Sequence, residues 1–161
     1  MSAESHKRPN PAELFPSTTS DTSTSTIELN PSEALIAISV LAVAADGQIS
    51  EEERQTLAAN HIRLFSSYAG EHFQEVFKKV LNLSSAYSPA EVFRAAKKTL
   101  NSGLRATAFA IATDLVLVDG ILTKEEKEFL VELAEALEIP DELGQKIIEV
   151  MTLKNCGQNL L

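Results

Sequence analysis

The feature that most constrains the fold of this chain is a segment that occurs twice, 73 positions apart. ADGQISEEER occupies residues 45–54, and VDGILTKEEK occupies residues 118–127. In both copies an apolar stretch precedes the Asp-Gly pair, and an amphipathic stretch follows the acidic cluster. With a two-residue adjustment the similarity continues, because EHFQEVF at 71–77 resembles ELGQKII at 142–148. This duplication predicts two similar helical units related by a pseudo-twofold axis.

Helix signals account for most of the sequence from residue 30 onward. NPSE at 30–33 and SPAE at 88–91 each place a capping side chain before a Pro, with Glu at the third helical position. This pattern is typical of a helix start. The stretches 31–45 and 104–118 are apolar on nearly every face, so we expect both to be buried at the centre of the fold.

Further helices are expected near 51–66, 71–83, 88–100, 123–138 and 141–153. Asn101-Ser102-Gly103 is expected to end the helix at 88–100. No stretch has a convincing strand pattern. The sequence therefore predicts an all-α fold, a pseudo-twofold helical bundle of about seven helices with two buried apolar helices at its centre.

The first 29 residues differ in composition from the rest of the chain. PSTTSDTSTST at 16–26 is rich in Ser and Thr and has no large apolar residue, so burial cannot offset the entropy of ordering it. We therefore assign residues 1–29 to a disordered tail and residues 30–161 to the helical domain. Within the tail, the short patch AELF at 12–15 reads as an undocked apolar pair rather than a docked one.

Charge and composition narrow the classes of partner. The formal net charge of −9 argues against nucleic acid, because phosphate binding needs Lys and Arg in excess. It leaves metal cations and basic protein surfaces as partners. Cys156 is the only cysteine, so no intrachain disulfide forms. No secretory signal is visible and no apolar run reaches the roughly 18 residues of a membrane span, so we expect a cytoplasmic protein without membrane insertion.

The repeated loop resembles the second half of a calcium-binding EF-hand loop. If Gly47 is the invariant glycine at position 6 of such a loop, positions 1 and 3 fall on Ala42 and Ala44. In the second copy they fall on Leu115 and Leu117. Those positions must supply side-chain oxygen, so neither copy is expected to be a functional EF-hand.

Signals that end one helix and start the next explain most of the repeated motif. Gly47 and Gly120 stand where a helix commonly ends in a left-handed residue. Ser50-x-x-Glu53 and Thr123-x-x-Glu126 are capping boxes, in which the Glu reaches back to the backbone of the cap. Only the Asp of each copy is left unexplained by this interpretation.

Three aspartates resist that structural interpretation. Asp46 and Asp119 follow the C-terminal ends of apolar helices, where the helix dipole disfavours an acid and a bound cation would favour it. Asp114 is the one charge within AFAIATDLVLV. A buried carboxylate needs a partner such as Arg105, a hydroxyl group or a metal ion.

The doubled ADGxIS-x-EE and VDGxLT-x-EE motifs, each after an apolar helix, resemble the TerB-like tellurite-resistance family over residues 30–153. The resemblance implies an all-helical bundle with internal pseudo-symmetry and a role in tellurite resistance or chemical stress. It also implies that acidic loop residues hold a divalent metal ion: Asp46 and Glu53 in the first copy, Asp119 and Glu126 in the second. Asp114 joins this set because of its own placement. Such oxygen ligands suit Ca²⁺, Mg²⁺ or Mn²⁺.

Other chemistry finds little support in the sequence. His61 and His72 lack the spacing of a helical metal pair and are expected to be surface or half-buried residues. Cys156 has no neighbouring base, and no Gly-rich phosphate loop or dinucleotide fingerprint is present. We therefore expect no enzymatic activity.

Two hypotheses of different class follow. The first is a non-enzymatic, cytoplasmic, TerB-like protein of the tellurite or metal-stress response, which binds a divalent cation at its repeated loops and acts with protein partners of a stress-response complex. The second is a metal-free helical protein–protein interaction module whose Asp-Gly loops are helix caps only. A third, a hydrolase that uses the acidic cluster, would need carboxylates that converge on an open pocket.

Overall fold

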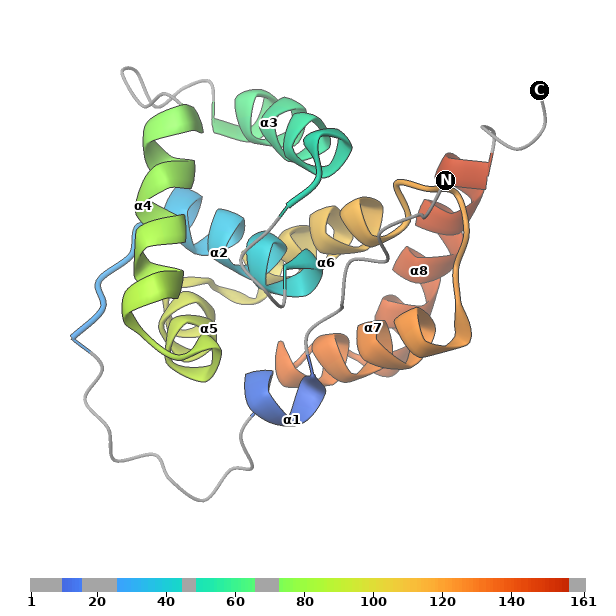
Figure 1. Ribbon diagram of the computed structural model, residues 1–161. Coiled ribbons are helices and arrows are strands. Elements are labelled where there is room, and N and C mark those ends of the chain that lie inside the picture. The colour runs from blue at the N-terminus through green and yellow to red at the C-terminus, as the bar shows by residue number, and fades with distance from the viewer. Residues whose placement is uncertain (1–9, 16–25, 45–48, 66–72, 157–161) are drawn as a thin grey trace.

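The computed structural model describes residues 10–15, 26–44, 49–65 and 73–156 (Figure 1). Its helices are α1 (Pro11–Leu14), α2 (Pro31–Val43), α3 (Glu51–Phe65), α4 (Phe73–Ala86), α5 (Pro89–Thr99), α6 (Ser102–Val116), α7 (Lys124–Ala136) and α8 (Asp141–Cys156). The described residues contain no strand. The predicted all-α fold is confirmed, with α1 added to the seven helices expected from the sequence.

The predicted caps of α2 and α5 are both present. The Asn30 side chain accepts a hydrogen bond from the backbone N–H of Glu33 at 2.8 Å, and the Glu33 carboxylate accepts one from the backbone N–H of Asn30 at 2.9 Å. Ser88 and Glu91 form the same reciprocal pair at the start of α5. Each box satisfies backbone donors that the first helical turn leaves without an intrahelical partner.

The two apolar helices form the centre of the bundle, as predicted. The α2 residues from Ala34 to Val43 are all buried, and α6 is buried from Ile111 to Val116. Helix α2 packs on α6, and in addition α2 contacts α3, α4 and α5 while α6 contacts α3, α7 and α8. Each Leu or Ile fully buried in this way contributes about 1.5–3 kcal/mol relative to an exposed side chain. No helix in the described residues has the length and apolarity of a membrane span.

The pseudo-twofold relation is visible in the order and packing of the helices. Helices α2, α3 and α4 make one unit and α6, α7 and α8 make the other; in Figure 1 α3 and α4 lie on one side and α7 and α8 on the other, with α2 and α6 between them. Helix α4 packs on α2 as α8 packs on α6, and α5 connects the units while covering α2. In the second unit Gly144 brings α8 close to α7, since a Cβ atom there would lie 3.2 Å from the Ala134 Cβ.

One helix boundary differs from the expectation. Asn101-Ser102-Gly103 was expected to end a helix, but Asn101 is the N-cap of α6, and its side-chain oxygen accepts a hydrogen bond from the backbone N–H of Leu104 at 2.9 Å. Ser102 and Gly103 therefore belong to the first turn of α6. Asn is among the strongest N-cap residues, which explains why this segment starts a helix directly after α5 ends.

The AELF patch is docked, so the expectation of an undocked pair is wrong. Leu14 is only 1% exposed, and α1 packs on α5 and α7. The ring of Phe15 lies 5.1 Å from that of Phe93 in an edge-to-face contact and 6.0 Å from that of Phe129. Aromatic contacts at these separations are favourable beyond the area they bury. Of the segment assigned to a tail, residues 10–15 and 26–29 are within the described residues and the others are outside them.

Candidate functional site

The second Asp-Gly loop has the geometry of a helix junction. Gly120 has φ of 80°, the left-handed conformation expected from its position, and its N–H donates to the Leu117 carbonyl at 2.8 Å. The Asp119 carboxylate accepts a hydrogen bond from the backbone N–H of Ile121 at 3.0 Å. Asp119 thus stabilises the turn that follows α6, which gives this residue a local role that the sequence analysis did not identify.

The start of α7 completes this junction. Thr123 is the N-cap of α7, and its hydroxyl accepts a hydrogen bond from the backbone N–H of Glu126 at 3.1 Å. The side chain of Glu126 is half-buried. The predicted cap at Thr123 is therefore confirmed.

The first loop is described only in part. Asp46 and Gly47 lie outside the described residues, so their predicted roles stay predictions. After them, the Ser50 hydroxyl accepts a hydrogen bond from the backbone N–H of Glu53 at 3.1 Å, which matches the cap at Thr123. Glu53 is buried, at 3% exposure. The two copies thus share the N-terminal cap of the helix that follows the loop.

Asp114 is bound by α8. Its Oδ1 accepts hydrogen bonds from the Lys154 ammonium and the Asn155 side-chain amide, each at 2.9 Å, and the residue is 5% exposed. Arg105, the partner considered from the sequence, donates instead to the Lys97 carbonyl and to Glu138. The buried carboxylate therefore joins α6 to α8.

The predicted metal ligands do not lie together as one donor set in the described residues. Across the described ranges no three side chains of His, Cys, Asp or Glu converge as a metal site would require. A calcium ion takes six to eight oxygen ligands and magnesium takes six. The described residues of the second loop therefore do not by themselves form a complete cage for either ion. A cation site at the repeated loops stays a prediction.

A buried polar pair lies at the other end of the bundle. The Ser32 hydroxyl and the His61 Nε2 are 2.7 Å apart, and each residue is buried. The imidazole also packs against the rings of Phe65 and Phe73. The expectation that His61 is a surface or half-buried residue is wrong, because α3 turns this side chain toward α2. His72 lies outside the described residues.

A salt bridge organises the first turn of α3. The Arg54 guanidinium donates to the Glu51 carboxylate at 2.9 Å, and Gln55 donates to the same carboxylate at 3.0 Å. These bonds, that of Arg54 above all, hold the pKa of Glu51 at about 2. Glu51 is exposed and Arg54 is half-buried, so this pair stabilises the start of α3 at the protein surface.

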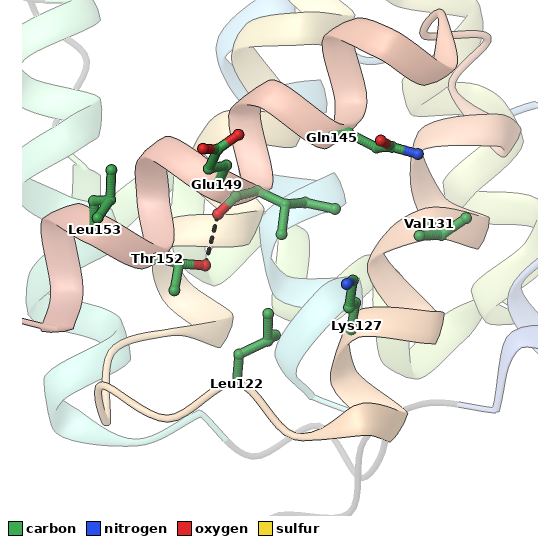
Figure 2. Close-up of a pocket in the computed structure, with 8 residues that line it drawn as sticks. Leu122, Lys127, Val131, Gln145, Glu149, Thr152 and Leu153 are labelled. Atoms are coloured by element: carbon green, nitrogen blue, oxygen red, sulfur yellow. Dashed lines mark hydrogen bonds between the residues drawn. The ribbon is translucent and has the colours of Figure 1, made fainter.

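An open apolar groove lies between α7 and α8 (Figure 2). Its volume is about 480 Å³, and its apolar lining comes from Leu122, Val131, Ile148 and Leu153, with Lys127 and Glu149 beside them. Val131 is 42% exposed and Leu153 is 67% exposed. These residues could not be singled out from the sequence, because an amphipathic pattern shows which face of a helix is apolar but not whether the fold covers that face.

Two of the exposed apolar side chains, Val131 and Leu153, lie side by side in the lining of this groove. Among the described residues, the exposed large apolar side chains of the second unit are Ile121, Val131, Leu143, Val150 and Leu153, and those elsewhere are Ile62, Leu64 and Tyr87. Scattered exposed apolar residues are normal, whereas a grouped set marks an interaction surface.

Comparison with known proteins places this chain in a family. The model of the family described as "Protein of unknown function (DUF533)" matches residues 3–151. This chain belongs to the DUF533 family. No curated protein and no solved structure matches it. The DUF533 match begins upstream of α1 and ends within α8, so it includes the N-terminal segment that the sequence analysis set apart from the helical domain.

Proposed function

We propose that this DUF533 chain is a non-enzymatic helical interaction module that binds a partner protein through the groove between α7 and α8. The observation that carries the proposal is the exposure of Val131 and Leu153 beside Leu122 and Ile148 in one groove. Exposing such side chains to water is unfavourable, at roughly 25 cal/mol per Å² of apolar surface. A partner that covers them gains this free energy.

The hydrogen bonds of the second loop support the same proposal. Asp119 holds the turn, Thr123 caps α7, and Asp114 is bound by two side chains of α8. These groups fix the positions of α6, α7 and α8 relative to one another. The loop therefore holds α7 and α8 in the arrangement that forms the groove. The groove is the surface that a partner contacts.

Site-specific photo-crosslinking in cells that produce the chain tests this proposal. A photoreactive residue at Gln145, on the edge of the groove, is expected to form a crosslink to one partner protein, identified by mass spectrometry. The same residue at Ile62, an exposed apolar position of α3, serves as the control. The crosslink from position 145 should disappear in the Val131→Ala/Leu153→Asn variant. Equal crosslinking from both positions, or none that depends on the groove, would refute the proposal.

A second candidate is the TerB-like role in tellurite or metal stress, with a divalent cation at the repeated loops. The duplication of Asp and Glu in both copies favours it, because carboxylates are the oxygen ligands that such cations prefer. Calorimetric titration of chelator-treated protein with Ca²⁺, Mg²⁺, Mn²⁺ and Zn²⁺ tests it. This candidate requires binding that is lost in Asp46→Ala/Asp119→Ala. Heat absent for all four ions would reject it and leave the groove proposal unaffected.

A further inference from the structure

We propose that the occupant of the α7–α8 groove is a basic amphipathic helix of a partner protein, which lays its apolar face along the groove. This inference rests on the proposed function and adds the chemical class of the partner. It follows from three observations: the shape of the groove, the comparison of the two units, and the charge around the groove.

The shape of the groove suits a helix. Its α8 lining runs from Gln145 to Leu153, which corresponds to about 12 Å along a helix, or roughly two turns. Leu122 closes one end between the two helices, as Figure 2 shows. Apolar residues at i, i+3, i+4 and i+7 of a partner helix would meet such a lining, which is a common mode of peptide recognition.

The comparison of the two units shows that the fold does not require the exposed apolar lining. In the repeat, Val131 corresponds to Ala58, and with the two-residue adjustment Leu153 corresponds to Asn82. At one of these pairs the burial agrees, because Asn82 and Leu153 are both exposed, whereas Ala58 is half-buried against the core and Val131 is exposed. The first unit thus forms the same helices with a small and a polar residue where the second unit has Val and Leu.

The chain's own apolar segment is already used elsewhere. Phe15, next to α1, packs on Phe129 of α7. Phe129 and Val131 are two residues apart, or about 200° around the helix, so they face opposite sides of α7. Helix α1 therefore covers the side of α7 away from the groove, and the described residues show no segment of this chain that covers Val131.

The balance of acidic and basic side chains on α7 and α8 favours a basic occupant. Helices α7 and α8 carry eight carboxylates and four lysines. Two of the lysines are in ion pairs, Lys146 with Glu142 and Lys154 with Asp114. Glu128 and Glu135, at i−3 and i+4 from Val131, lie on its face of α7, and the charged residues that line the groove itself are Glu149 and Lys127. The excess of carboxylates over lysines on these two helices attracts a basic helix and repels the same acidic surface of a second copy.

A matched pair of synthetic peptides tests the inference. Both are amphipathic helices with the same leucine face, and the polar face carries lysines in one and glutamates in the other. Binding is measured by fluorescence anisotropy, and the contacted residues are located by NMR shift changes in the isotope-labelled protein. The lysine peptide is expected to shift groove residues and to bind at least about tenfold more tightly than the glutamate peptide. Val131→Ala/Leu153→Asn should weaken it by about tenfold, while Ile62→Asn should not change it.

Each other outcome overturns the inference in a distinguishable way. Equal binding of both peptides in the groove would reject the basic partner and leave the proposed function standing. Shifts spread over the acidic surface and unchanged in Val131→Ala/Leu153→Asn would show attraction by charge alone. Self-association that is lost in that variant would make a second copy the occupant. If neither peptide binds, the inference fails, and the crosslink from position 145 decides separately whether the proposed function fails with it.

Discussion

At the scale of single residues, the polar groups inside this bundle hold helices together. Asp114 illustrates this role, because a carboxylate on the central helix α6 receives hydrogen bonds from two adjacent residues of α8, Lys154 and Asn155. Neither partner could be chosen from the sequence, since they lie 40 and 41 positions away. What the sequence does show is that one charge in an apolar helix requires a partner.

Asp114→Ala should destabilise the protein by about 1–3 kcal/mol, because it leaves the buried amide of Asn155 without one of its acceptors. Lys146→Ala, which removes an exposed i,i+4 ion pair with Glu142, is the control and should change the free energy of unfolding by less than about 0.5 kcal/mol. Urea unfolding followed by circular dichroism measures both. Equal stability of Asp114→Ala and the wild type would contradict the structural role of this residue.

Glu51 provides a pH-dependent prediction at the same scale. Its pKa is lowered from 4.5 to about 2, mainly by the hydrogen bond from Arg54. The stabilisation from this pair is therefore complete above pH 4.5 and is lost as the pH falls toward 2. Arg54→Gln should raise the pKa of Glu51 toward 4.5, with Gln55 retaining part of the shift. NMR titration of the carboxyl carbon measures it, and an unchanged pKa in the variant would refute this cause.

At the scale of elements, helix caps define where the helices of the bundle start and turn. Asn30, Ser88 and Thr123 were recognised as caps from local sequence, and all three cap as expected. Asn101 was misassigned, because Asn, Ser and Gly favour both the end of one helix and the start of the next. Only the hydrogen bond from Leu104 distinguishes the two.

Substitution of Gly120 by Ala tests the junction after α6, and substitution of Gly103, in the first turn of α6, is the comparison. Gly120→Ala forces a left-handed residue to carry a Cβ atom, which should cost about 1–2 kcal/mol. Gly103→Ala lies within the first turn of α6, where an added Cβ would make only an ordinary contact with the Asn101 side chain at 3.5 Å, so it should stabilise by up to about 1 kcal/mol. Thermal unfolding of both variants should give shifts of opposite sign. A neutral Gly120→Ala would show that the turn does not depend on glycine.

At the scale of the whole molecule, the duplication predicted the bundle well but could not predict how its two units differ. The shared motifs identified the two central helices and the matching order of helices in the two units. They did not reveal the docking of α1, which depends on contacts of Phe15 with Phe93 and Phe129 in distant helices. Nor did they reveal the groove, since exposure of Val131 and Leu153 depends on the packing of α7 against α8.

The central claim is that the apolar lining of the α7–α8 groove serves a partner rather than the fold. The most direct test is the free energy of unfolding of Val131→Ala/Leu153→Asn, which gives the second unit the residues of the first. Because Leu153 is 67% exposed and Val131 is 42% exposed, we predict a change of less than about 1 kcal/mol. A loss of about 2 kcal/mol or more would contradict the claim, since it would mean that these side chains are needed to hold the bundle itself together.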